Sequence, residues 1–423
     1  MNAIVPTRAA ARFSALLATL PAIFCCNASA AQVAVHGFGT LGAAYIDKPD
    51  GWGFRRSLNE HPNDHPWRAD LDSVVGLQIN YQPTEKLEFV AQAAASRLDS
   101  DAERNDYLEL GFVGWHPNSD WNVQLGRVNL DAYLISDHRV VGFTYQFIRP
   151  PAEYYSRMPT SLDGGNVSRL WVVDDVQWQT KLFVGRTENG AGDRRLTLWP
   201  VVGLVGSRES DGLLLRISAL HGRTRNSIGA LEPLIQGLQQ MQSLPVPQVS
   251  ADAAHMQAAL STRGTRTNYI AGAIAYDRND WLLTAEINRT KVEHRPSISF
   301  TSGYVSAGRR FGAVSAFVMQ SMIRRDSAVF QAPDWATPLA AFGPQLAQQA
   351  QQLAFGAATA INSTAPNQST SSLGMRWDVT PRVALKAQWD HMRWPNQGSA
   401  LWSGADGAAG KGNVVAVAAD FVF

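Results

Sequence analysis

The sequence predicts an all-β protein, a 16-stranded antiparallel transmembrane β-barrel. Three observations predict it: an N-terminal export signal, a regular alternation of tight turns with longer loops, and an apolar, alternating strand that ends the chain. After the signal, no apolar run approaches the ~18–20 residues that a membrane helix needs. An exported chain without such a helix is periplasmic, secreted or an outer-membrane barrel, and the strand pattern favours the barrel.

Residues 1–31 are predicted to be a secretory signal peptide. Arg8 and Arg12 supply positive charge, residues 13–26 form an apolar run, and residues 28–30 (Ala-Ser-Ala) fit a small-residue cleavage site. We therefore expect the mature chain to be a single transmembrane barrel over residues 32–423.

The net charge is close to zero, and the composition by itself gives no clue to function. The hydrophobic share is 45% and the mean hydropathy is −0.16, which a membrane barrel can show because lumen-facing residues dilute its lipid face. Lys and Arg number 37 and Asp and Glu 36, so the charge balance gives no argument for nucleic acid as a partner. Both cysteines, Cys25 and Cys26, lie in the signal, which excludes a disulfide framework or a thiolate metal site in the mature chain.

The first predicted strand, residues 33–45, contains a formal GxGxxG motif at Gly37, Gly39 and Gly42. In a nucleotide-binding protein this motif closes a strand and opens a helix. Here it lies within the strand, and the polar residues 47–51 that follow are loop-forming. We interpret these glycines as places where a barrel strand bends or is closely approached.

Short alternating runs then follow one another along the chain, which gives sixteen strands, seven tight turns and eight longer loops. The predicted strands are residues 33–45, 73–81, 87–96, 107–115, 121–128, 169–173, 176–186, 199–207, 212–221, 267–277, 281–291, 298–310, 313–324, 371–379, 383–393 and 412–423. Tight turns on one rim and long loops on the other are what a membrane barrel requires, since hairpins pair every strand and closure leaves no edge in lipid. An even count brings both chain ends to the periplasmic rim.

The last strand, residues 412–423, has one apolar face that runs to the terminal Phe423, and an opposite face that carries Asp420. This pattern suits a strand with lipid on one side and a watery lumen on the other. Aromatic residues gather near the tight turns and on the last hairpin, as expected for rings at a lipid–water interface and not for the core of a soluble sandwich. They are Tyr81, Trp115, Trp121, Trp178, Tyr276, Trp281, Trp377, Trp389 and Trp394.

Two of the longer loops carry helical patterns. Residues 233–243 and 344–355 each place apolar side chains on one stripe behind a proline, and Gly356 predicts the end of the second helix. As helices they would cap the extracellular mouth of the barrel. Their Gln- and Ala-rich composition leaves disorder as the alternative.

The mature chain resembles the general porins of Gram-negative outer membranes in its signal, strand count, loop order and terminal Phe423. In that family the third long loop folds inward and narrows the channel, and residues 129–168 occupy the corresponding place here. The family's acidic loop core is missing, and residues 149–155 read RPPAEYY instead, which indicates a divergent member. The resemblance implies passive diffusion of small hydrophilic solutes or ions, a homotrimer, and the bacterial outer membrane, with its lipid and lipopolysaccharide, as the location. No motif suggests a cofactor.

Charge and aperture at the narrowest point set the selectivity of a wide pore. The expected constriction residues are Arg139, Arg149, Glu153, Tyr154, Tyr155, Arg157 and Asp163, with the two tyrosines setting the aperture. The expected lumen wall consists of polar residues of opposite parity to the lipid face: Glu109, Lys181, Arg216, Glu286, Arg376, Asp378, Lys386 and Asp390, together with Glu88, Gln92 and Gln177. Their mixed signs predict a transverse field and not a filter of one sign. For each loop charge, a structural ion pair or a solvated position is the alternative.

An enzyme has less support in the sequence. His61 and His65 have a helical metal-ligand spacing, but each is followed by proline, so we expect no metal site there. A GxSxG motif is absent, and His138 beside Asp137 is the one hint of a hydrolase. Two alternatives to a channel stay open: a barrel without an open pore, acting as an adhesin, structural protein or hydrolase, and a secreted soluble β-protein.

Overall fold

The computed structural model describes residues 32–57, 63–96, 107–156, 159–189, 195–293, 295, 298–363, 367–396, 401–403 and 408–423. The predicted signal peptide over residues 1–31 lies outside the described residues, as do Arg157 and His61.

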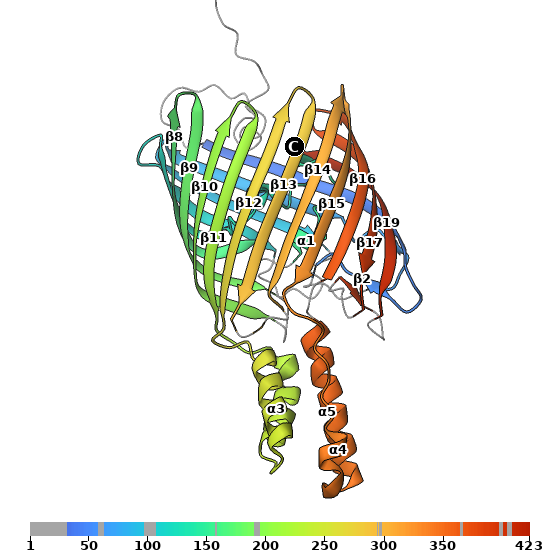
Figure 1. The fold of residues 1–423 in the computed structure, drawn as a ribbon. Coiled ribbons are helices and arrows are strands. Elements are labelled where there is room, and N and C mark those ends of the chain that lie inside the picture. Colours follow the sequence, from blue (N-terminus) through green and yellow to red (C-terminus); the bar gives the residue numbers. More distant parts are fainter. Residues whose placement is uncertain are drawn as a thin grey trace, which may run out of the picture.

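Within the described residues, sixteen long antiparallel strands form one sheet that closes into a barrel (Figure 1). They are β1 (Gln32–Asp47), β4 (Val74–Thr84), β5 (Leu87–Ser96), β6 (Leu108–Trp115), β7 (Trp121–Asn129), β8 (Ser161–Val173), β9 (Val176–Asn189), β10 (Leu196–Ser210), β11 (Leu213–Thr224), β12 (Arg266–Arg278), β13 (Trp281–Val292), β14 (Phe300–Phe311), β15 (Val314–Arg325), β16 (Asn367–Thr380), β17 (Val383–Trp394) and β19 (Gly410–Val422). The short strands β2 (Gly53–Phe54), β3 (Trp67–Arg68) and β18 (Trp402–Ser403) lie in longer loops. Strand β1 pairs with β4 on one side and β19 on the other, which closes the sheet.

The predicted fold class is confirmed, because the long strands of the described residues close into one barrel and do not form two stacked sheets. Hairpin turns join the strands at the rim that carries the C-terminus, where the Val422 amide donates to the carbonyl of Arg382 in the last turn. Three of these turns, at Asp174–Asp175, Asp211–Gly212 and Asn279–Asp280, have positive φ at both central residues. Asp and Asn tolerate this conformation, and it matches the twist of the flanking strands.

Side chains alternate between the two faces of the wall. The outward face is a continuous apolar band in which Leu41 is 67% exposed and Val305 61% exposed, as lipid contact requires. Most of the aromatic residues predicted at the interface, including Trp115, Trp281 and Trp377, are exposed on this face. Trp394 is an exception.

Trp394 is buried and faces inward, because its position on β17 has the opposite parity to the exposed Trp389. Its ring packs against Trp52 and Trp402, with centroids 5.1 and 4.9 Å away. The prediction of an interfacial position for Trp394 is therefore wrong.

The GxGxxG motif lies inside β1, as predicted, and the structure gives its reason. A Cβ atom on Gly37 would lie 2.0 Å from the ring of Phe423, and one on Gly39 would lie 2.5 Å from the ring of Phe421. Gly37 also exchanges two backbone hydrogen bonds with Phe423, of 2.8 and 2.9 Å. The glycines therefore let the last aromatic residues lie flat over the seam between the first and last strands.

We expect Gly37→Val to destabilise the folded barrel by about 1–3 kcal/mol, because the new side chain must displace the Phe423 ring. Gly272→Val is the matched control, since Gly272 is also a strand glycine and a Cβ there meets nothing within 4 Å. The urea midpoint for unfolding in lipid vesicles measures both variants. Equal midpoints for the two variants would contradict this account of the seam.

Strand β8 begins earlier than predicted, at Ser161 instead of residue 169. The early part contains Gly164 and Gly165, which have low intrinsic strand propensity. Pairing with β7 and β9 holds them in the ladder nevertheless. The long connection before β8 is correspondingly shorter than 129–168.

Two long loops build a helical bundle that projects from the barrel rim (Figure 1). It contains α2 (Glu232–Gln242), α3 (Pro247–Leu260), α4 (Ala336–Leu339) and α5 (Pro344–Ser363). The two predicted helices are confirmed, but α5 continues through Gly356 to Ser363, and α3 was not predicted. Leu238, Met256 and Trp335 are fully enclosed in the core that the two loops share. None of the described helices has the length and hydropathy to cross a membrane.

Candidate functional site

The connection between β7 and β8 is bonded to inward-facing residues of many strands. We call residues 130–156 the inner segment. It contains the short helices η3 (Ser136–His138), η4 (Gly142–Thr144) and α1 (Ala152–Tyr155). Helix α1 packs on β14, β15 and β16, and η4 packs on β1 and β19.

The segment begins with a buried ion cluster. The Asp131 carboxylate pairs with Lys181 of β9 at 2.6 Å and with Arg216 of β11. The next residue, Ala132, accepts hydrogen bonds at its carbonyl from the Ser218 hydroxyl at 2.9 Å and the Tyr269 hydroxyl at 3.1 Å. Burial alone would raise the pKa of Asp131, but the two cations outweigh it and lower that pKa to about 2.

The pKa of Asp131 sets the lowest pH at which this ion cluster can stabilise the inner segment. Because the folded pKa of Asp131 lies below its ordinary value of 3.8, the ion cluster contributes full stability above that value and loses it as the pH falls towards 2. We expect the backbone amides of the inner segment to keep their hydrogen-exchange protection from pH 7 to about pH 5 and to lose part of it near pH 2.5. Asp131→Asn should show the reduced protection already at pH 7, and unchanged protection in this variant would contradict the assignment.

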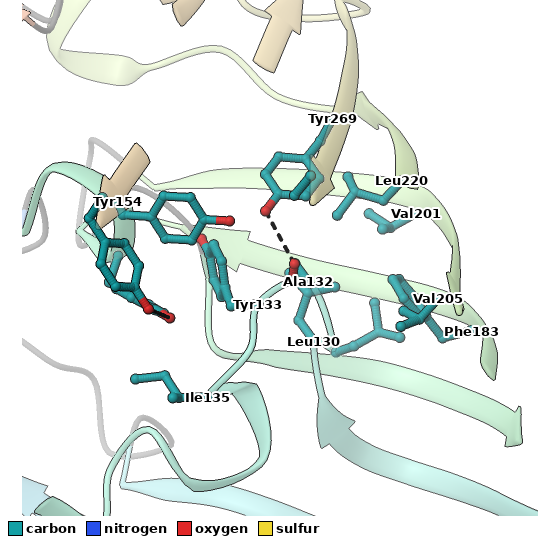
Figure 2. Close-up of a cluster of buried hydrophobic side chains, with 14 of the residues drawn as sticks. Leu130, Ala132, Tyr133, Ile135, Tyr154, Phe183, Val201, Val205, Leu220 and Tyr269 are labelled. Carbon is teal, nitrogen blue, oxygen red and sulfur yellow. Dashed lines mark hydrogen bonds between the residues drawn. The ribbon is translucent and has the colours of Figure 1, made fainter. Parts of the chain in front are cut away.

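An aromatic and aliphatic cluster fastens the segment to the wall beyond this point (Figure 2). Tyr133 lies against Tyr154 and Tyr155 of the segment, with ring centroids 5.5 and 5.0 Å away, and against Tyr269 of β12 at 6.3 Å. The wall contributes inward-facing Phe183, Val201, Val205 and Leu220. Both tyrosines predicted at the constriction are thus buried in a packed cluster.

Two glutamates hold the segment at α1. Glu286 of β13 accepts from the Leu134 amide at 3.0 Å and from the hydroxyl of Tyr155. Glu153 of α1 accepts from the Ser321 hydroxyl of β15 at 2.7 Å and the Gln368 amide of β16 at 2.5 Å. Both glutamates are buried, and these neutral donors satisfy their oxygens.

Arg149 is the most enclosed cation of the segment. It binds both oxygens of Asp72, at 2.9 and 2.6 Å, and donates to Asp390 of β17 at 2.9 Å. The side chain of Arg149 is 3% exposed, that of Asp72 1% and that of Asp390 5%. This bidentate geometry is the one for which a guanidinium is suited.

Two further wall cations bind the backbone of the segment. Lys386 of β17 donates to the carbonyls of Gly142 and Phe147, each at 2.7 Å, and pairs with Asp420 of β19 at 2.7 Å. Arg376 of β16 donates to the carbonyls of Phe143 and Tyr145, at 2.6 and 2.9 Å. Asp378, also predicted on the wall, pairs with Arg376 but is half exposed.

Three predicted site residues are not brought together with these groups. Asp163 lies on β8 with outward parity and pairs with outward-facing Arg127 at 2.7 Å, so its prediction as a constriction residue is wrong. Glu109 lies at the shift in register between β5 and β6, where the cross-strand register skips this residue. It is adjacent in sequence to the buried Leu110, so the two do not share a face of the strand. Arg157 lies outside the described residues. Arg139 does lie on the segment, where it donates to the Tyr155 carbonyl at 2.6 Å.

Most of the predicted charged residues therefore form structural ion pairs or hydrogen bonds to the backbone of the inner segment. A structural ion pair was the alternative that the sequence left open for the loop charges. Sequence reasoning missed two of the acids involved, Asp72 and Asp131. It placed Asp420 on the lumen-facing side of the last strand, where Asp420 is the one charge, but did not name it as a site residue. Asp72 and Asp131 lie outside strands, where parity gives no signal.

The opposite part of the wall, from β4 to β8, is lined differently. Its inward positions carry neutral amides, among them Gln78, Gln92, Gln124 and Asn166, beside the apolar residues Val90, Leu110, Val128 and Leu162. The hydrogen bonds and ion pairs of the inner segment given above end on β9, β11 to β13, β15 to β17 and Asp72. The polar contacts of the segment therefore lie mostly on one side of the barrel, while Val128 and Leu162 join its apolar cluster.

The residues that hinted at a hydrolase do not form a catalytic set among the described residues. The Asp137 carboxylate accepts from the Asn129 amide at 3.4 Å. The pKa of His138 is lowered by burial, against the opposing effect of Asp137. No hydrogen bond joins the His138 ring to a serine in the described part of the chain, and no group of three or more metal-ligating side chains occurs there.

The outward wall is hollowed over β8 to β15, where a cavity of about 1010 Å³ faces outward. Gly206, Gly272 and Gly303 contribute no side chains to this wall. Its sides are apolar residues such as Ile217, Ile274 and Ile287.

No family model and no curated protein matches the sequence. Among solved structures, the fold is similar to an anion-selective porin from Comamonas acidovorans, with a TM-score of 0.53 and 10% identity over 93% of this chain and 100% of that one. It is also similar to the outer membrane channel DcaP of Acinetobacter baumannii, with a TM-score of 0.51 and 10% identity over 94% of this chain and 99% of that one. Salmonella typhi OmpF in complex with daunomycin gives a TM-score of 0.51 and 12% identity, over 92% of this chain and 97% of that one.

These likenesses define the class of the protein at the level of fold. The chain has the fold of these porin-type barrels, and the fold expected from the sequence resemblance is confirmed to that extent.

Proposed function

We propose that this chain is a channel of the bacterial outer membrane through which small hydrophilic solutes diffuse passively. The observation that carries the proposal is the lining of the barrel interior. The hydrogen bonds and ion pairs of the inner segment end on β9, β11–β13, β15–β17 and Asp72, while the wall of β4–β8 carries amide side chains beside apolar ones. A polar wall inside an apolar-coated barrel is the arrangement that a water-filled passage requires.

The charges in the interior support weak ion selectivity. Arg149, Lys386 and Asp131 are each neutralised by buried partners. Paired charges produce a smaller field than the free, mixed-sign charges expected from the sequence.

Single-channel recording in planar bilayers tests the proposal. The folded protein should give discrete conductance steps in KCl, with a small reversal potential under a salt gradient. A folded protein, identified by its heat-modifiable gel mobility, that never produces steps would end the proposal.

The alternative is a barrel without an open pore, and one observation favours it. The inner segment joins a large apolar cluster on the side of β8–β15 and a second one, containing Phe54, Ile148 and Trp402, near β17, β19 and β1. A plugged barrel would act through its projecting helical bundle, as an adhesin or structural protein. Liposomes containing the protein would then fail to swell in isosmotic sugar.

We also propose a homotrimer in a membrane of lipid and lipopolysaccharide, on the sequence resemblance alone. Mass determination of the detergent-extracted complex tests the trimer.

A further inference from the structure

The hollow on the outward wall over β8 to β15, which we call the outer hollow, is built from two neighbouring cross-strand rows of residues. In the first row, the glycines of β10, β12 and β14 alternate with Ile217, Ile287 and Met322 of β11, β13 and β15. The second row begins with Trp171, Trp178 and Arg208 of β8, β9 and β10 and continues through apolar side chains to β15. The volume of about 1010 Å³ lies at the top of the roughly 300–1,000 Å³ that is usual for ligand sites.

One end of the outer hollow lies at the hairpin rim. Trp171 and Trp178 are cross-strand neighbours close to the turn that joins β8 to β9, and Arg208 lies close to the turn that joins β10 to β11. The first and last described residues lie at this rim too, away from the helical bundle (Figure 1). The short turns of outer-membrane barrels are periplasmic, and tryptophan rings prefer the membrane interface. This end of the outer hollow therefore lies at the headgroups of the periplasmic leaflet.

Two outward-facing arginines lie at this end. The guanidinium of Arg208 lies 5.9 Å from the ring centre of Trp178, and that of Arg169 lies 5.6 Å from the ring centre of Trp171. Neither arginine forms an ion pair or a hydrogen bond with any residue that the structure describes. A cation beside the hydrocarbon of a membrane is costly unless it has a counter-charge. The cationic end of the outer hollow therefore suits an anion that lies in the interface.

We propose that the outer hollow binds one anionic glycerophospholipid of the periplasmic leaflet. Arg208 and Arg169 hold its phosphate, and its acyl chains follow the apolar rows towards the middle of the membrane. Apolar packing alone would not select a lipid, because lipid tails are as apolar as the wall. The arginines supply the selection, since a guanidinium binds phosphate through paired N–H donors. A lipid whose headgroup also carries an ammonium would bring a third cation to the two arginines.

Lipid titration of the full chain in mild detergent, read by native mass spectrometry, tests the site. After detergent washing, palmitoyl-oleoyl phosphatidylglycerol should saturate at a single lipid per barrel, and the phosphatidylethanolamine with the same chains should bind about tenfold more weakly. In Arg169→Gln/Arg208→Gln the half-saturating concentration of phosphatidylglycerol should rise about tenfold, because charge-assisted hydrogen bonds are lost. Ala285→Phe is an independent second variant, because Ala285 lines the outer hollow from β13. It should raise that concentration about threefold, since the ring takes the place of acyl-chain contacts.

Arg309→Gln and Ala316→Phe are the matched controls. Arg309 also lies over an outward tryptophan of the hairpin rim, Trp281, at 5.2 Å, and Ala316 is its exposed cross-strand neighbour, but neither lines the outer hollow. Both controls should bind phosphatidylglycerol like the unmodified chain, and every variant should keep the heat-modifiable mobility of a folded barrel. The inference is overturned if the two lipids bind equally well or if the arginine variant binds like the controls. It is also overturned if Ala285→Phe changes the number of chains in the complex and leaves lipid binding unchanged, because a second copy of the chain would then cover the outer hollow.

Discussion

Arg149→Met is expected to destabilise the attachment of the inner segment by about 3–5 kcal/mol, which is the usual cost of removing one partner of a buried ion pair. The variant keeps the length and most of the volume of the side chain but leaves the carboxylates of Asp72 and Asp390 buried without their cation. Because these carboxylates hold the segment between Asp72 and β17, the segment should detach there first. We expect single-channel currents that fluctuate between the original level and a higher one.

Arg289→Met is the matched control for Arg149. Arg289 also pairs with an aspartate, Asp326, at 2.8 Å, but on the outer face, where its side chain is 48% exposed. An exposed pair contributes less than about 1 kcal/mol, so the current and the unfolding midpoint should hardly change. A steady current of unchanged size in Arg149→Met would show that the segment does not depend on this pair.

A double-mutant cycle distinguishes loss of the pair from general damage. Asp72→Asn removes one buried charge, so Arg149→Met/Asp72→Asn should be less destabilised than the sum of the two single variants. Additive losses would mean that the residues act independently, in conflict with their 2.6 Å contact.

The barrel could be predicted from the sequence because its signal is repeated in every strand. A period of two fixes which residues face lipid, and this alone placed Lys181, Arg216, Glu286, Lys386 and Asp390 on the inward face. The sequence could not say which loop residue each of them meets. These partners are 50 to 244 residues apart, as for Lys181 with Asp131 and Lys386 with Gly142, and strand periodicity carries no information across a loop.

Other misses have local causes. Asp163 was assigned to the loop because the neighbouring Gly164 and Gly165 have low strand propensity. Pairing with β7 and β9 is what keeps these residues in a strand. Gly356 was taken as a helix end, but it lies within α5, where a Cβ atom would meet Leu234 of α2 at an ordinary contact distance of 3.6 Å. The packing of α5 in the bundle therefore outweighs the roughly 1 kcal/mol that glycine costs in a helix.

The helical bundle should unfold separately from the barrel when its core is opened. Trp335 is completely buried between the two loops, its indole N–H donates to Asp252 of α3 at 3.3 Å, and its backbone amide donates to Gln351 of α5 at 2.8 Å. Trp335→Ala should cost the bundle about 3–5 kcal/mol, the usual range for deleting a buried Trp or Phe side chain. The expected result is rapid proteolysis within the two helical loops, residues 226–263 and 327–363.

Phe355→Ala provides the comparison, because Phe355 lies on α5 of the same bundle but is 58% exposed. This variant should resist proteolysis as well as the unmodified chain does. Both proteins should keep the heat-modifiable mobility of a folded barrel, since hydrogen-bonded strand pairing around the closed sheet does not involve the helices. If Trp335→Ala instead prevented the barrel from forming, the bundle would be part of the barrel's folding unit, and the two loops would have to associate before the strands close.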